Sequence, residues 1–157
     1  MPVPPPPAHR ARRRLLAAGV GAATIVLVRP LAAAPDALAE VIAAFTGGAA
    51  AQAGGIALDV ARLVDNGNAV PVTVAVDSPM SATDRVAVIA LFNERNPQRE
   101  VALFEFGPHA GQAAVSTRIR LATSQRLAAV ARMSDGSFRL AVADVVVALA
   151  ACIEDME

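Results

Sequence analysis

The sequence predicts a mainly β protein: an immunoglobulin-like antiparallel β-sandwich preceded by one short N-terminal helix. From about Ile56 to the C-terminus, apolar residues recur at every second position, which is the spacing of strands that bury one face. Turn-forming Gly, Pro, Asn and Asp residues interrupt this pattern every ten to twenty residues or so, as in a sandwich of two sheets.

The first 39 residues are expected to be an export leader. A proline-rich stretch leads into arginines at 10 and 12–14, and residues 15–28 then carry no charge. This run has the length of a signal-peptide core and is too short for a membrane span, so no stable membrane anchor is expected. Arg12-Arg13, followed by one residue and two leucines, matches the twin-arginine type of signal, with a Sec signal as the alternative. We therefore expect a periplasmic protein.

Two small-x-small motifs compete for the cleavage site of this leader. Ala32-Ala33-Ala34 is followed by Pro35, an unfavourable residue after a cut, and Ala37-Leu38-Ala39 has the same form. The site is expected between residues 34 and 39. A cut after Ala39 leaves nine arginines against thirteen acidic residues, a formal charge of −4. Such a domain has no electrostatic reason to bind nucleic acid or an anionic membrane.

An amphipathic helix is expected directly after the leader. Its apolar stripe begins behind Pro35-Asp36 and ends at Gly47-Gly48, which gives a short helix of about ten residues. The apolar residues at i, i+3, i+4 and i+7 are Leu38, Val41, Ile42 and Phe45.

Seven strands are expected in the single domain at 40–149. Residues 124–133 also admit a helix, because Leu127, Val130 and Ala131 fit a spacing of 3.6 residues. A strand is preferred there, because the alternation leads directly into a Ser-Asp-Gly-Ser turn and another valine-rich run. The expected strands are 56–60, 70–76, 85–93, 101–106, 114–121, 126–133 and 138–149.

Few residues after the leader are suited to catalysis. His109 is the only histidine there and lies in a Gly-Pro-His-Ala-Gly turn, where a solvated role is the simpler interpretation. One histidine and one cysteine make no zinc pattern, and no nucleophile-elbow or phosphate-loop motif occurs. We expect no enzyme, no metal site and no cofactor.

Two further features have a plain and a functional interpretation. Arg118 and Arg120 lie two apart in an expected strand, so they share one face with Ser116. That face is either an exposed polar surface or a binding surface for an anion or a partner's carboxylates. Asn66-Gly67 first of all indicates a hairpin, since both residues tolerate positive φ.

Cys152 is the only cysteine and lies near the C-terminus. An unpaired thiol in an oxidising compartment can form intermolecular disulfides or become oxidised, so the presence of a single cysteine indicates a specific role. It is either a small buried residue at the end of the last strand or the attachment point for a sulfur-containing group. The acidic residues that follow it favour exposure, and no second cysteine can resolve an adduct formed there.

Six segments, read together, have the pattern of a known family. They are residues 44–48, 65–74, 76–80, 92–97, 116–122 and 129–136. In this combination the chain resembles SoxY, the sulfur-carrier subunit of the periplasmic thiosulfate-oxidising Sox system, over essentially all of residues 40–152.

The resemblance implies that Cys152 is the carrier cysteine on a C-terminal arm, residues 150–157. In the SoxY family the arm is Gly-Gly-Cys-Gly-Gly, and its cysteine bears thiosulfate-derived intermediates. Here all four glycines are replaced, so the arm resembles that of the SoxY-related AACIE arm proteins. Alanine and a β-branched residue restrict the backbone, so this arm should swing less than a glycine arm, with a reach of about 13 Å from Ala148. The replacing residues are Ala150, Ala151, Ile153 and Glu154.

The function that follows from the resemblance is that of a carrier rather than an enzyme. It implies a heterodimer with a SoxZ-like subunit, and partner enzymes that load and oxidise the sulfur intermediate on Cys152. The alternative is a non-catalytic periplasmic docking or assembly module in which Cys152 is unreactive.

Overall fold

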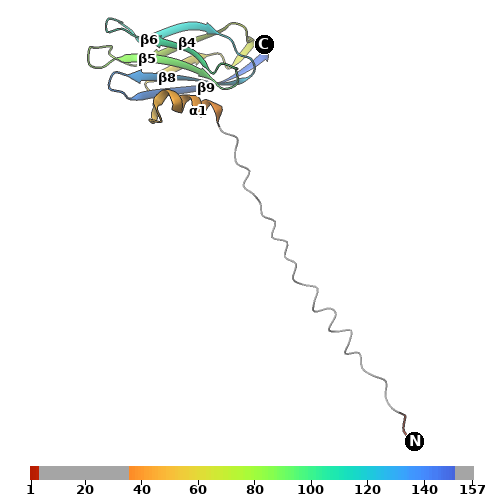
Figure 1. Cartoon of the computed structure of the whole chain (residues 1–157). Helices are drawn as coiled ribbons and strands as arrows, with labels where there is room; N and C mark the ends of the chain where they lie inside the picture. The colour runs from red at the N-terminus through yellow and green to blue at the C-terminus, as the bar shows by residue number, and fades with distance from the viewer. Residues whose placement is uncertain (4–35, 151–157) are drawn as a thin grey trace. The chain divides into compact units, whose positions relative to one another are not determined.

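A computed structural model of the chain describes residues 1–3 and 36–150 (Figure 1). The compact β-rich unit begins at Pro35. Most of the expected leader lies outside the described residues, as do Cys152 and the rest of the arm from residue 151 onward. Within the described ranges, no helix is long and apolar enough to cross a membrane.

The order of elements confirms the predicted fold class, a β-sandwich with one short N-terminal helix. The larger sheet has the order β1-β9-β8-β5-β6, with β3 also paired to β9, and the smaller sheet has the order β2-β4-β7. The elements are α1 (Ala37–Thr46), β1 (Ala51–Ala53), β2 (Ile56–Val60), β3 (Leu63–Asn66), β4 (Val70–Val76), β5 (Val86–Asn93), β6 (Glu100–Glu105), β7 (Ala114–Ile119), β8 (Gln125–Met133) and β9 (Phe138–Leu149).

The core between the two sheets is built from small branched side chains. β4 shows the pattern most clearly, because its alternate residues are buried while the residues between them are more exposed. β5 and β8 are buried along almost their whole length, since the smaller sheet covers one face and α1 covers part of the other. The inward residues of β4 are Val70, Val72, Val74 and Val76.

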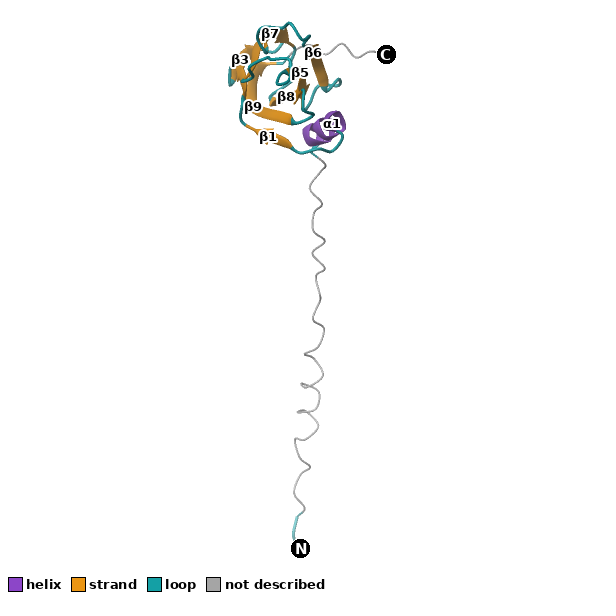
Figure 2. Ribbon diagram, turned by 90° about the vertical axis from the view of Figure 1, so that its left-hand side faces the viewer, coloured by secondary structure: helices purple, strands orange, loops and turns teal. Residues whose placement is uncertain are grey.

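The helix α1 packs on the outer face of the larger sheet (Figure 2). It begins behind Asp36 and ends at Gly47, whose φ of 63° is a left-handed conformation that glycine adopts without strain. Phe45 meets the edges of two sheet aromatics, Phe92 at 5.5 Å and Phe138 at 6.0 Å between ring centroids. These contacts make α1 part of the folded domain.

Two short strands, β1 and β3, were not predicted, and both pair in parallel with β9. The strand expected at 126–133 is confirmed against the helical alternative. The hairpin expected at Asn66-Gly67 is wrong, because Asn66 pairs with Leu149 instead of with β4. A turn does form there, since Asn66 Oδ1 accepts a hydrogen bond from the backbone N–H of Asn68 (2.9 Å). This turn carries the chain from the larger sheet to the smaller one.

Candidate functional site

The arm leaves the sandwich from the end at which β9 stops. The carbonyl of Leu149 accepts a hydrogen bond from the N–H of Gly67 (2.8 Å), and the carbonyl of Gly67 accepts one from the N–H of Leu121 (2.8 Å). Ala150, the next residue, is exposed. The last strand is therefore tied at its final residue to the turn after β3, and through Gly67 of that turn to the segment after β7. Ala150 begins the arm.

This tie shortens the reach expected from the sequence. With β9 held as far as Leu149, three residues extend from the anchor to the thiol. A fully extended chain of three residues spans about 10 Å, compared with the 13 Å expected from Ala148. Cys152 and its neighbours Ala151, Ile153 and Glu154 lie outside the described residues, so the described site is the base of the arm.

An amide network supports this base from the side. Asn96 Oδ1 accepts hydrogen bonds from the N–H of Ala122 (3.0 Å) and from Gln125 Nε2 (2.7 Å), while Asn96 Nδ2 donates to the carbonyl of Arg120 (2.8 Å). Gln125 Oε1 in turn accepts from the N–H of Arg95 (2.7 Å). The loop after β5 is thereby fixed to the segment between β7 and β8.

That same segment holds β9 directly. Ser124 Oγ accepts a hydrogen bond from the N–H of Val147 (2.9 Å), three residues before Ala150. Asn96, Ser124 and Gln125 were not predicted as site residues. Their sequence signal is that of ordinary turn and strand-end residues, although Asn96 belongs to one of the segments that carry the family resemblance.

A charged cluster joins the start of α1 to the same part of the larger sheet. Arg126 Nη2 lies 2.7 Å from Asp36 Oδ1 and 3.1 Å from Glu94 Oε1. The hydrogen bonds from Arg126 hold the pKa values of both carboxyls below their usual range. Those to Glu94 and then Asp36 raise the pKa of the guanidinium. The two carboxylates therefore stay ionised to a lower pH than ordinary carboxyls do.

Arg118 and Arg120 share an exposed face with Ser116, as predicted. Ser116 Oγ lies 2.9 Å from Thr73 Oγ1 across the β4–β7 pair. Both ion pairs found among the described residues involve Arg126, so neither Arg118 nor Arg120 is paired with a described carboxylate. Arg120 also lies next to Leu121, which is bonded to the base of the arm. Their binding role stays a prediction.

His109 lies at the other end of the sandwich. It belongs to the loop between β6 and β7, which enters β7 at Ala114 opposite Ala75, whereas the arm base adjoins the far end of β7. The length of β4 separates these ends by about 20 Å. An arm with a reach of about 10 Å cannot bring its thiol to that histidine.

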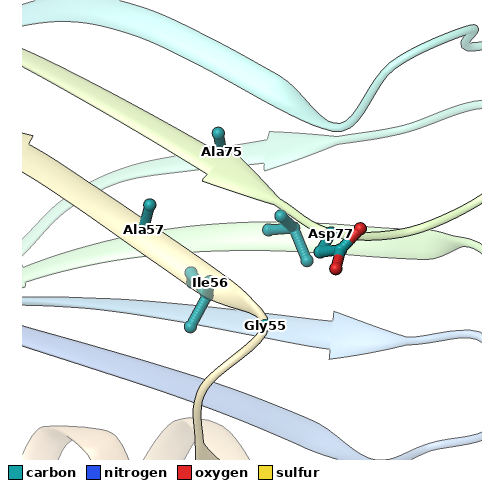
Figure 3. A pocket seen from close by; sticks show the side chains of 6 residues that line it. Gly55, Ile56, Ala57, Ala75 and Asp77 are labelled. Atoms are coloured by element: carbon teal, nitrogen blue, oxygen red, sulfur yellow. The ribbon is translucent and has the colours of Figure 1, made fainter.

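A shallow hollow is also found at the His109 end. It has a volume of about 410 Å³ and is apolar apart from the carboxylate of Asp77 (Figure 3). Among the described residues, no group of three His, Cys, Asp or Glu side chains is placed to hold a metal ion. The lining residues are Gly55, Ile56, Ala57, Ala75, Val76 and Asp77.

Comparison with known proteins places this architecture in a family. The model of the family described as sulfur oxidation protein SoxY matches residues 42–152. Among solved structures, the sulfur carrier protein SoxY from Chlorobium limicola f thiosulfatophilum is 30% identical, with a TM-score of 0.60 over 73% of this chain and 98% of that one. A search of curated proteins gave no match.

More distant structures share the fold alone. The superoxide reductase (neelaredoxin) from Ignicoccus hospitalis is 19% identical, with a TM-score of 0.53 over 60% of this chain and 80% of that one. A putative superoxide reductase from Thermotoga maritima is 16% identical, with a TM-score of 0.53 over 66% and 89% of the two chains. The family match over most of the domain, with the 30% identical structure, shows that the chain belongs to the SoxY family of sulfur oxidation proteins.

Proposed function

We propose that this protein is a sulfur carrier of the SoxY type, which holds a covalent sulfur intermediate on Cys152 while separate enzymes act on it. One observation carries the proposal: the family match ends at residue 152, which is the only cysteine of the chain. The tied end of β9, three residues earlier, supports it, because a short arm on a fixed base presents a thiol at one end of a rigid domain.

The chemistry of attachment requires a partner enzyme. Joining the Cys152 thiol to the terminal sulfur of a compound such as the thiosulfate dianion breaks the S–H bond, forms an S–S bond and releases two electrons and the thiol proton. The chain has one cysteine and so no dithiol to exchange these electrons. A separate oxidising enzyme is the electron acceptor in this scheme, and the arm brings the thiol to it.

The remaining parts of the proposal concern partners and location. A SoxZ-like subunit forms a heterodimer with this chain, and the loading and oxidising enzymes of a Sox-like system act on the arm. The twin-arginine-type leader places the complex in the periplasm. Ala150 and Ala151 assign the arm to the AACIE type, whose restricted backbone requires the partner's cleft to come to the sandwich end more closely than for a glycine arm.

Alkylation separates the carrier from a docking module with an unreactive cysteine. Iodoacetamide should modify Cys152 in the folded protein about as fast as in the urea-unfolded chain, because a carrier thiol must be open to its partners. Cys152→Ser provides the control, since it removes the only reactive thiol. Protection of Cys152 in the folded protein would contradict the carrier and favour the docking module.

A further inference from the structure

We propose that the oxidising enzyme that loads Cys152 binds to an exposed apolar surface around the base of the arm, formed by β3 and the end of β9. This surface, the arm-base patch, consists of Leu63, Val146 and Leu149. The inference rests on the carrier role in the proposed function, because that role requires the enzyme. The experiment below distinguishes the failure of one from the failure of the other.

The arm-base patch gathers the most exposed large apolar side chains of the domain. Within residues 36–150, these are Leu149 (68% exposed), Leu63 (65%) and Val146 (54%). Leu63 and Val146 are register partners in the parallel β3–β9 pair, so their side chains are neighbours on one face of the sheet. Leu149 ends the same strand three residues later. Apolar side chains that are grouped in this way, instead of scattered singly, indicate a contact surface.

The helix α1 leaves this part of β9 uncovered. Alternate residues of β9 face outward, and the first two of them, Phe138 and Leu140, pack in the cluster beneath α1. Further along the strand, the outward residues Val142 and Val146 are exposed. In Figure 2, β3 and α1 lie well apart from each other. The apolar row thus continues past α1 to the arm without a cover from the described chain.

The short reach of the arm indicates which partner covers the patch. The thiol lies within about 10 Å of Leu149, so an enzyme that acts on it must come over this end of the sandwich. A small transient interface buries about 600 Å² on each partner, which corresponds to a disc of about 14 Å radius. Val146 and its register partner Leu63 lie about 10 Å from Leu149. A disc centred on the arm base therefore includes all three residues.

The charges around the patch favour a partner with a basic rim. Asp65 on β3 and Asp144 on β9 are exposed, while Arg62 adjoins Leu63. Both ion pairs among the described residues involve Arg126, Asp36 and Glu94, so neither of these two aspartates is paired with a described basic side chain. The arm adds three acidic residues at 154–157. An enzyme surface with an apolar centre and basic groups around it is complementary to this end of the domain.

The test measures loading of the carrier by the enzyme of its own host. The full protein is purified from the host periplasm with any subunit bound to it, freed of adducts by dithiothreitol, and mixed with thiosulfate and a periplasmic extract of the host lacking this gene. Mass spectrometry of the Cys152 peptide follows the adduct over time at several carrier concentrations. Leu63→Ser should lower kcat/KM for the carrier about tenfold or more, through a higher KM, because it weakens docking and leaves the thiol unchanged.

Leu103→Ser is the matched control. Leu103 is an exposed leucine on β6, at the opposite edge of the larger sheet, so this variant should be loaded like the parent. Val146→Thr keeps the shape of the side chain and should raise KM as well, which keeps the test valid if Leu63→Ser unfolds. Asp65→Arg should raise KM by repulsion from the basic rim, and a lower KM would overturn that part. Parent-like kcat/KM in folded Leu63→Ser and Val146→Thr would overturn the inference.

The mass of the purified assembly separates the enzyme from other occupants of the patch. Light scattering should give the same mass for Leu63→Ser as for the parent. Loss of a bound subunit, or dissociation of a dimer of this chain, would show that the patch is a permanent subunit interface and would overturn the inference while the carrier role stands. A parent protein that the extract does not load would count against the carrier role itself, and against the inference with it.

Discussion

Replacing Asn96 with alanine removes the side chain that fixes the base of the arm. Three hydrogen bonds are lost, from the N–H of Ala122, from Gln125 Nε2 and to the carbonyl of Arg120. A hydrogen bond of this kind contributes about 1 kcal/mol net, and more where a buried partner is left unsatisfied. Ala122 and Gln125 are buried, whereas water can replace Asn96 at the exposed Arg120.

The free energy of unfolding should therefore fall by about 2 to 3 kcal/mol in Asn96→Ala. For a urea m-value of about 1 to 3 kcal/mol/M, the unfolding midpoint moves down by about 0.7 to 3 M. Gln98→Ala is the matched control, because Gln98 lies in the same loop with an exposed side chain, and its midpoint should stay close to the parent's.

Hydrogen exchange connects this change to the arm. The N–H groups of Leu121 and Val147 bond to Gly67 and Ser124 at the arm base, so both should exchange faster in Asn96→Ala than in the parent. A loss of stability below about 0.5 kcal/mol, the range of an ordinary surface substitution, would refute the network as a support of this base.

Two further changes test α1 and the charged cluster. Leu38→Ala should lower the free energy of unfolding by about 2 to 5 kcal/mol, because it leaves a cavity at a fully buried site. Glu40→Gln, at an exposed position two residues further along α1, is the control and should change the urea midpoint little. Equal urea midpoints for the two variants would contradict the packing of α1. Because folding lowers the pKa values of Asp36 and Glu94, these ionised carboxylates stabilise the folded state. This stabilisation is fully present above the ordinary carboxyl pKa values, 3.8 and 4.5, and is lost as the pH falls through the lower pKa values of the folded protein. Arg126→Gln should therefore reduce the dependence of the urea midpoint on pH between about 6 and 3, and an unchanged dependence would contradict this cause.

The sequence predicted the long strands well, because each combines alternation with branched residues. β2, β4 and β9 begin and end where the pattern indicated. β1 and β3 escaped prediction, since one is Ala-Gln-Ala and the other is four residues long and mostly exposed. Their strand conformation is due to pairing with β9, which local sequence does not reveal.

The site was predictable only in part, for a similar reason. Cys152 stands out as the single cysteine, and the face shared by Arg118 and Arg120 follows from strand geometry. The network around Asn96 depends on hydrogen bonds between residues 24 to 29 positions apart, so it exists only once the sheets are assembled. Asn66-Gly67 likewise shows that a turn signal fixes a bend and leaves open which strands the bend connects.

The central claim, covalent carriage of sulfur on Cys152, is tested most directly by intact and peptide mass spectrometry of the mature protein from cells grown on reduced sulfur compounds. The account predicts added sulfur or thiosulfonate mass on the Cys152 peptide, removed by dithiothreitol and missing from Cys152→Ser. An unmodified Cys152 under all such growth conditions, or the same added mass in Cys152→Ser, would contradict it.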